Sequence, residues 1–492
     1  MNVRVNQLSV FCLAAWLLFA APVRGGDVSS LADAVENKDA AAIEALIEKK
    51  ADARAAQADG MTALHWAVRQ DDSGLVKRLI AAGADVKAAN HYGVTPLAMA
   101  CTGGNADIVL QLLEAGADPN GTLPGGETAL MTAARTGRLA PVKSLLAKGA
   151  DVNAREHKGQ TALMWAAAEG NAAVVDALLA AGADFRATLP SGFSPLFFAV
   201  REGRQEVVFQ LLKAGMNVDE VMRPERKGGA NKKASNALIL AVENGHFELA
   251  MALLNAGADP NVRPAGYSAL HALTWVRKPI RGDGDPPPIG SGNLNSLEMV
   301  RQLVKHGADV NVRLEKGESG RGRFTTTGST PFELAARASD VPLLRLLHEL
   351  GADPKLANID DCPPLLAAAG VGALSDGDDS AGTDEEAVAT VRYLLDLGAD
   401  VNAVDKHGET VMHGAAYLSR WQLVPLLADR GAKIEVWNQK NKLGWTPLMI
   451  AQGHRPGNFR PESATIAAFE RVMRFQGVEP PKAVRNANSP EY

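Results

Sequence analysis

The sequence predicts an all-α solenoid, in which about twelve short helix-turn-helix units stack in chain order and each unit packs only on its neighbours. A Gly-Ala-Asp signal, Gly-Met-Asn in its last copy, recurs at a constant step of 33 residues, at Gly83, Gly116, Gly149, Gly182 and Gly215. Apolar residues make up 46% of the chain but aromatic residues only 5%. This composition suits thin Ala/Leu layers between stacked helices better than one thick core.

One unit, residues 161–184, shows the local pattern. Thr161 supplies a side-chain oxygen for the first helix, which is predicted over 162–168, and Gly170 permits a left-handed end. A second helix is predicted over 172–180, because its apolar residues form one stripe of a 3.6-residue period. Two helices this short cannot bury their apolar faces alone, so the unit requires stacked neighbours.

A motif similar to Thr-Pro-Leu-His begins the units. Its copies are Thr62-Ala-Leu-His65, Thr95-Pro-Leu-Ala98, Thr128-Ala-Leu-Met131 and Ser194-Pro-Leu-Phe197. Together with the 33-residue period, this motif resembles the ankyrin repeat. The resemblance implies short β-hairpin-like fingers between the helix pairs, and a concave face of fingers and first helices that binds other proteins. It also implies that His65, His271 and His413 tie neighbouring fingers together through backbone hydrogen bonds, so we assign them no catalytic role.

Six segments are expected along the chain. They are a secretory signal peptide at 1–26, an N-terminal capping repeat at 27–57, five regular repeats at 58–222, repeats with insertions at 223–404, C-terminal repeats and a cap at 405–477, and a disordered tail at 478–492. The signal peptide is predicted from Arg4 and the apolar run from Leu8 to Ala21. An uncleaved anchor is the alternative. The chain is therefore expected to be exported, periplasmic or secreted, without a membrane span after signal removal, and to resemble exported bacterial ankyrin proteins.

Insertions lengthen the later repeats. Residues 223–233 and 314–327 are expected in fingers, whereas 278–292, 371–384 and 453–462 are expected between the two helices of a pair. Helices are predicted to resume at 297–305 and 387–397. Loop-closure entropy grows slowly with length, so such insertions cost little stability.

Composition narrows the function classes. A net charge of −5 gives no reason to expect nucleic acid as a partner. Cys101 and Cys362 are expected to be reduced and buried, because they lie in distant repeats. No motif for a cofactor, a bound metal or catalysis is present, so we expect a non-enzymatic monomer that binds one or more proteins.

The candidate partner-binding residues lie at finger tips and at the ends of first helices, where Tyr, Trp and Arg are the usual interface anchors. They are Arg69, Gln70, His91, Tyr92, Arg135, His157, Lys158, Phe193, Arg201, Tyr267, Trp275, Tyr417 and Trp445. Ordinary solvated surface is the alternative for each. Trp66, Trp165 and Phe198 form either a binding ladder or, as we favour, packing between adjacent first helices.

Two rival functions remain open at this stage. The acidic cluster Asp376, Asp378, Ser380, Asp384, Glu385 and Glu386 resembles a calcium loop, but Ala381 and Ala387 break the EF-hand template, which favours a flexible acidic loop. An enzyme or calcium-dependent binder would need the insertions at 278–292 and 371–384 to cooperate on one edge. A structural spacer is the other rival.

Overall fold

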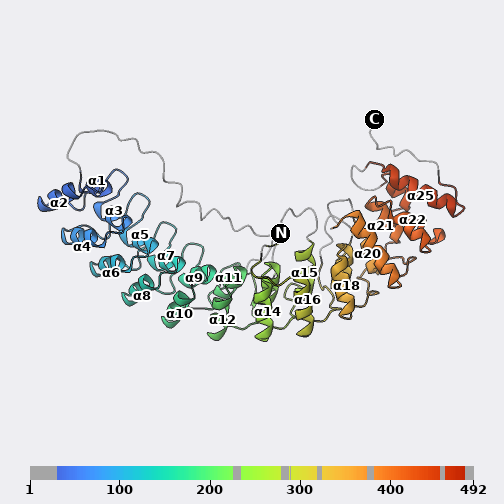
Figure 1. The fold of residues 1–492 in the computed structure, drawn as a ribbon, viewed down its shortest axis with the longest axis horizontal. Helices are drawn as coiled ribbons and strands as arrows, with labels where there is room; N and C mark the ends of the chain where they lie inside the picture. Colours follow the sequence, from blue (N-terminus) through green and yellow to red (C-terminus); the bar gives the residue numbers. More distant parts are fainter. Residues whose placement is uncertain are drawn as a thin grey trace. The chain divides into compact units, whose positions relative to one another are not determined.

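Helix pairs make up nearly all regular structure in the computed structural model, which describes residues 30–224, 234–278, 288, 290–317, 324–373, 382–454 and 460–481 (Figure 1). Twelve helix pairs lie within these residues, which confirms the predicted all-α ankyrin-type solenoid. The chain divides into an N-terminal unit, up to Asn217 with 222–232, and a C-terminal unit, 218–221 with 233–492. The predicted signal peptide at 1–26 lies outside the described residues.

The N-terminal unit contains six helix pairs. They are α1 (Leu31–Glu36), α2 (Ala40–Glu48), α3 (Ala63–Arg69), α4 (Ser73–Ala81), α5 (Pro96–Gly103), α6 (Ala106–Glu114), α7 (Ala129–Thr136), α8 (Leu139–Ala147), α9 (Ala162–Glu169), α10 (Ala172–Ala180), α11 (Pro195–Arg201) and α12 (Gln205–Lys213). Within this unit, first helices such as α5, α7 and α9 form one row, and second helices such as α6, α8 and α10 form another (Figure 1). Each helix from α5 to α10 therefore packs between two helices of its own kind.

The predicted caps set the helix bounds. The Thr161 hydroxyl accepts a hydrogen bond from the Met164 N–H at 3.4 Å, and α9 begins at the next residue, Ala162. Gly170 ends α9 in the left-handed region at φ 82°. The helix runs one residue beyond the predicted 162–168, whereas α10 has the predicted bounds.

An asparagine two residues after several of the Gly-Ala-Asp turns joins one repeat to the next. Asn120 Nδ2 donates to the Gly149 carbonyl at 3.0 Å, and Asn120 Oδ1 accepts from the Asp151 N–H at 2.7 Å. Asn153 repeats both bonds one unit later, with Gly182 and Asp184. These bonds link only consecutive turns, so they fix the spacing of neighbouring repeats.

The C-terminal unit contains six more helix pairs and one extra helix. The finger before its first pair holds the strands β1 (Val221–Met222) and β2 (Ser235–Asn236), which form a two-stranded sheet. The helices are α13 (Ala237–Glu243), α14 (Phe247–Asn255), α15 (Ala269–Arg277), α16 (Ser296–Lys305), α17 (Pro331–Arg337), α18 (Val341–Glu349), α19 (Pro364–Ala369), α20 (Asp384–Asp396), α21 (Val411–Tyr417), α22 (Leu423–Asp429), α23 (Ile434–Trp437), α24 (Pro447–Ala451) and α25 (Ser463–Phe475). The one-turn helix α23 replaces part of a finger and was not predicted.

Three insertions separate the helices of a pair, at the predicted places: α15 from α16, α19 from α20, and α24 from α25. The prediction for the start of α20 is wrong. This helix begins at Asp384 instead of residue 387, because Thr383 and Glu386 form a capping box that supports an additional first turn.

Burial follows the predicted thin layers. Cys101 and Cys362 are free and buried, as expected, and burial raises the pKa of the Cys101 thiol to about 12.

Among the described residues, no helix combines the length and the apolar character that crossing a bilayer requires.

Candidate functional site

The finger face of the N-terminal unit is the surface made by its fingers and by the first helices α3, α5, α7, α9 and α11. Nine predicted partner-binding residues belong to these elements. Arg69, His91, Tyr92, His157 and Lys158 are exposed, whereas Gln70, Arg135, Phe193 and Arg201 are half-buried. The structure thus leaves every one of these nine accessible to solvent, at least in part.

Three arginines on the finger face lie over aromatic rings. The guanidinium carbon of Arg69 is 5.1 Å from the ring centroid of Trp66, and that of Arg135 is 5.6 Å from Trp165 in the following repeat. Arg201 lies over two rings, Phe193 at 5.3 Å and Phe198 at 5.2 Å. Such cation–π contacts restrain long side chains that would otherwise be mobile.

The finger tips are held by their neighbours. The His91 N–H donates to the Asp59 carbonyl at 3.0 Å, and the His157 N–H donates to the Gly125 carbonyl at 3.1 Å. Gly93, at φ 72°, closes the turn beneath Tyr92, whose side chain is 56% exposed. A large aromatic side chain is therefore presented on an ordered turn.

The three motif histidines join neighbouring fingers, as the resemblance implied. His65 Nε2 lies 3.0 Å from the Val94 carbonyl of the next finger, His271 Nε2 lies 3.2 Å from the Ser329 carbonyl, and His413 Nε2 lies 3.3 Å from the Trp445 carbonyl. Burial lowers the pKa of His271 and of His413 to about 4, so both are neutral at pH 7.

Two predicted partner-binding residues of the C-terminal unit are buried, and the expectation that they face a partner is wrong. Tyr267 and Tyr417 are each 4% exposed. The Tyr267 hydroxyl donates to Glu243 at 2.7 Å, and the Tyr417 hydroxyl donates to the buried Glu409 at 3.0 Å. A carboxylate at hydrogen-bonding distance allows each phenol to be buried with its polar atom satisfied.

The other two predicted residues of this unit, Trp275 and Trp445, are half-buried. The Trp275 ring packs edge-on against Tyr267, with a centroid separation of 5.2 Å. The Trp445 backbone completes the contact of His413 with the finger. Trp275 therefore has a role in packing, whereas Trp445 contributes a backbone contact, and each residue reaches solvent only in part.

Glu333 is a residue that the sequence analysis missed. It occupies the histidine position of Thr330-Pro-Phe-Glu333 and is fully buried. Burial raises its pKa well above the ordinary value, against weaker opposing contributions from Ser329, Arg313 and Arg337. A Glu in line with the repeated histidine was the signal that could have identified it.

The acidic cluster is only partly a loop. Asp376, Asp378 and Ser380 lie outside the described residues, whereas Asp384, Glu385 and Glu386 form the first turn of α20, where acidic side chains favour the helix N-terminus. Their expected place in an inserted loop is therefore wrong. Among the described residues, no group of three or more His, Cys, Asp and Glu side chains is arranged to hold a metal ion.

One ion pair connects repeats that are not neighbours. Lys278 directly follows α15. Its Nζ lies 2.7 Å from Oε1 of Glu386, in α20, and donates to the Ser339 carbonyl at 3.1 Å. The pair α17 and α18 comes between them in the chain. The prediction that each repeat contacts only its neighbours is wrong here, where Lys278 and Glu386 each lie beside an insertion that separates the helices of a pair.

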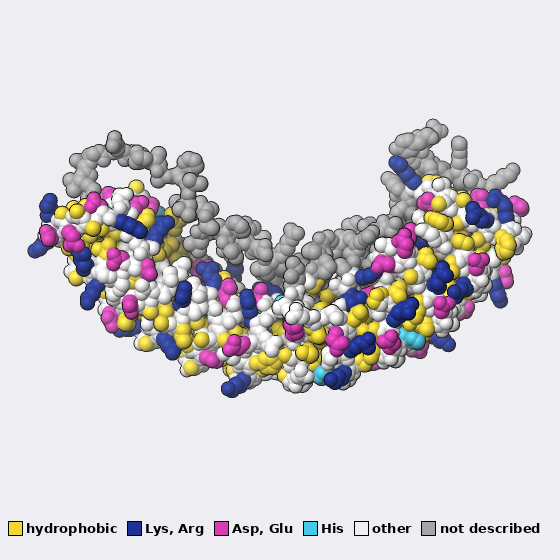
Figure 2. All heavy atoms as spheres, viewed as in Figure 1, with side chains coloured by type: hydrophobic (Ala, Val, Ile, Leu, Met, Phe, Trp, Pro, Cys, Tyr) yellow, Lys and Arg dark blue, Asp and Glu magenta, His cyan; other side chains and the backbone are white. Residues whose placement is uncertain are grey.

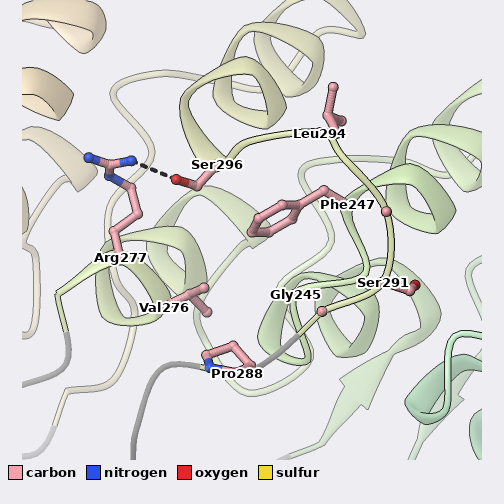
Figure 3. A pocket seen from close by; sticks show the side chains of 10 residues that line it. Gly245, Phe247, Val276, Arg277, Pro288, Ser291, Leu294 and Ser296 are labelled. Carbon is pink, nitrogen blue, oxygen red and sulfur yellow. Dashed lines mark hydrogen bonds between the residues drawn. The ribbon is translucent and has the colours of Figure 1, made fainter.

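A cavity of about 330 Å³ lies between α14, α15 and the segment before α16 (Figure 3). Phe247, Val276 and Pro288 supply apolar walls, and Arg277 donates to the Ser296 hydroxyl at 2.6 Å. Arg277 also forms two bonds to Asp340, at 2.7 and 3.0 Å. The Arg277 guanidinium is thus held by hydrogen bonds within the protein.

Charges on the visible surface alternate in sign. Lys and Arg side chains are interspersed with Asp and Glu on the visible face of each unit, and neither unit shows a large patch of one sign there (Figure 2). This pattern agrees with the small net charge of −5. Specific binding would therefore depend on the placement of individual side chains.

Stacked helix pairs, three of which carry a histidine that ties one finger to the next, define a helical repeat protein. The family model of three-copy ankyrin repeats matches residues 31–123, 73–156, 130–222 and 381–458, and the single ankyrin repeat model matches 235–264. Because these matches cover more than half of the chain, the chain belongs to the ankyrin repeat family.

Several curated proteins are similar over part of their length. Human ankyrin repeat and SOCS box protein 6 is 34% identical over 180 residues, 36% of this chain and 34% of the relative. Human ankyrin repeat and SOCS box protein 16 is 34% identical over 247 residues, which are 44% of this chain and 48% of the relative. A Danio rerio protein described as a putative palmitoyltransferase, ZDHHC13, is 32% identical over 255 residues, which are 48% of this chain and 35% of the relative. The chain thus spans between a third and a half of the length of these relatives.

Proposed function

We propose that this chain is a non-enzymatic scaffold that binds a partner protein on the finger face of its N-terminal unit. Ankyrin repeats are protein-interaction modules, and the observation that carries the proposal is the half-exposed row of aromatic and arginine side chains on this face. The palmitoyltransferase activity in one relative's description is not transferred, because this chain covers 35% of that protein.

A capture experiment with matched variants tests this proposal. A photo-crosslinking amino acid is placed at Tyr92 on a finger tip or at the exposed Lys143 on α8, and the native extract is probed with each protein. Crosslinking of the same protein from Tyr92 only, with loss after Arg135→Ala, supports the proposal. Equal crosslinking from both positions, or none from Tyr92, contradicts it and leaves a structural spacer.

We also propose that the protein is exported and acts in a periplasm or outside the cell, on the basis of the sequence pattern at 1–26. Residues 1–40 fused to alkaline phosphatase in a bacterial host provide the test, because this reporter needs disulfides that form outside the cytoplasm. Activity that is lost after Leu17→Arg supports export. Activity that stays at the level of a leaderless fusion contradicts it.

A further inference from the structure

We propose that the finger face of the N-terminal unit binds an extended peptide segment whose carboxylates are spaced to meet Arg69, Arg135 and Arg201. This inference rests on the proposed binding function and specifies the chemistry of the partner. The three arginines occupy one repeat position, seven residues after the cap of their first helix, and they recur every second repeat, 66 residues apart. The positions between them hold the uncharged Thr102 and Ala168.

The arginines are pre-arranged to bind an anion. Stacking on Trp66, on Trp165 and on the Phe193 and Phe198 rings fixes one face of each guanidinium. The N–H groups of a guanidinium lie in its plane, in the fork geometry that matches a carboxylate, so a ring against one face does not cover them. Less side-chain entropy is then lost on binding.

The donors of two arginines are available. Neither Arg69 nor Arg135 has an ion-pair partner within 4.0 Å or a side-chain hydrogen bond in the part of the chain that the structure describes. Arg201 Nε already binds the Glu202 carboxylate at 2.9 Å while its guanidinium stays over the aromatic rings. A stacked arginine of this row can therefore bind a carboxylate without leaving its ring.

A purely structural role explains less of this arrangement. A cation near a helix C-terminus is stabilised by the helix dipole, but that stabilisation does not require an aromatic ring beneath each arginine. Glu169 and Glu202, one residue further on in two of the repeats, place negative charge beside the row. They disfavour a continuous polyanion such as nucleic acid, and they favour a chain with separated carboxylates.

The spacing of the row sets the spacing of the ligand. Two repeats correspond to about 20 Å, if neighbouring first helices lie about 10 Å apart. An extended peptide advances about 3.3 Å per residue, so carboxylates about six residues apart reach successive arginines. Apolar residues between them would contact the exposed parts of the aromatic rings.

Synthetic peptides of roughly 15 residues test the spacing directly. The probe carries three glutamates about six residues apart among apolar and serine residues, and the two controls carry glutamines at these positions or the same glutamates side by side. Calorimetry should show the spaced-glutamate peptide binding at least about tenfold more tightly than either control, with the difference shrinking at high salt.

Two triple variants with equal charge change locate the site. Changing Arg69, Arg135 and Arg201 to Gln should abolish the preference for spaced glutamates. Changing Lys77, Lys143 and Lys213, which are exposed on second helices, to Gln should preserve it. If the arginine variant folds poorly by circular dichroism, the Arg135→Lys variant alone should weaken the preference several-fold, since lysine keeps the charge but not the fork.

The outcomes separate this inference from the proposed function. Equal binding of all three peptides, no binding at about 1 mM, or tighter binding of single-stranded DNA overturns the acidic-segment inference. The crosslinking experiment at Tyr92 uses the native partner and is unaffected by these results. A protein captured there, together with peptides that fail, would retain the scaffold and reject its acidic ligand.

Discussion

The two units place different side chains at one repeat position, seven residues after the cap of the first helix. In the N-terminal unit this position carries Arg69, Arg135 and Arg201, which stack on rings and remain open to solvent on one side. In the C-terminal unit it carries Glu243, Trp275 and Tyr417, each of which contacts a finger residue of its own unit, and also Arg337, which lies over the Phe324 ring at 4.5 Å.

In the C-terminal unit, the side chains at this position bond to or pack on groups of the same unit. Glu243 accepts from the Tyr267 hydroxyl, Trp275 packs on the Tyr267 ring, and Tyr417 donates to Glu409, which also accepts from Asn441 Nδ2 at 2.8 Å. The residue type at this position and the adjacent finger together decide which contacts the side chain makes. Three arginines recur at this position in the N-terminal unit and only one, Arg337, in the C-terminal unit, so we favour the N-terminal unit for recognition.

The largest expected difference between the units concerns a buried ion pair. In Arg277→Ala, Asp340 would remain a buried charge, because the Arg277 and Asp340 side chains are only 15% and 1% exposed. We expect a loss of about 3–5 kcal/mol from the unfolding free energy of the C-terminal unit. Urea unfolding followed by hydrogen exchange would assign the loss to one unit.

The matched control for this prediction is Arg78→Ala in the N-terminal unit. Arg78 pairs with Glu44 at 2.7 Å, but their side chains are 43% and 57% exposed, so we expect at most about 1 kcal/mol. Similar losses for both variants would show that the buried pair does not distinguish the C-terminal unit.

Local rules were sufficient to predict the repeats. The caps at Thr161 and Gly170, the 33-residue step and the two short apolar stripes each act within one unit, and the finger contacts of His65 follow from the same repeat. The sequence therefore predicted the two helices of residues 161–184 to within one residue.

Contacts between repeats were harder to predict. The burial of Tyr417 depends on Glu409 and on Asn441 in a later finger, and Lys278 pairs with Glu386 across an intervening repeat. Neither contact has a fixed spacing in the sequence. The stacking of Arg135 on Trp165 crosses a repeat boundary and was missed for the same reason.

The histidine position offers a second, smaller test of this comparison, through pH. Burial raises the pKa of Glu333 above its ordinary 4.5, so above pH 4.5 the unfolded state ionises first and folding stability falls. We expect Glu333→Gln to gain stability relative to the natural chain by about 1.4 kcal/mol per pH unit, until the folded carboxyl also ionises.

His413→Gln provides the control of opposite sign. The pKa of His413 is lowered from 6.5 to about 4, so the natural chain loses stability as pH falls between these values, while the unfolded state takes up the proton. The variant should lack that loss. Urea midpoints measured from pH 4 to 8 check both slopes, and parallel curves for all three proteins would refute the assigned burial of these groups.

The smallest expected effect belongs to the ion pair that reaches past a repeat. Lys278 and Glu386 have 22% and 43% exposed side chains, so solvent screens their attraction, and we expect a coupling of about 0.5–1 kcal/mol in a double-mutant cycle. High salt should remove it. Arg430 and Asp396, 2.8 Å apart, provide a comparison pair in consecutive repeats of the same unit. If the first coupling is zero while the second is measurable, the insertions do not connect distant repeats, and both units are stabilised by nearest-neighbour contacts alone.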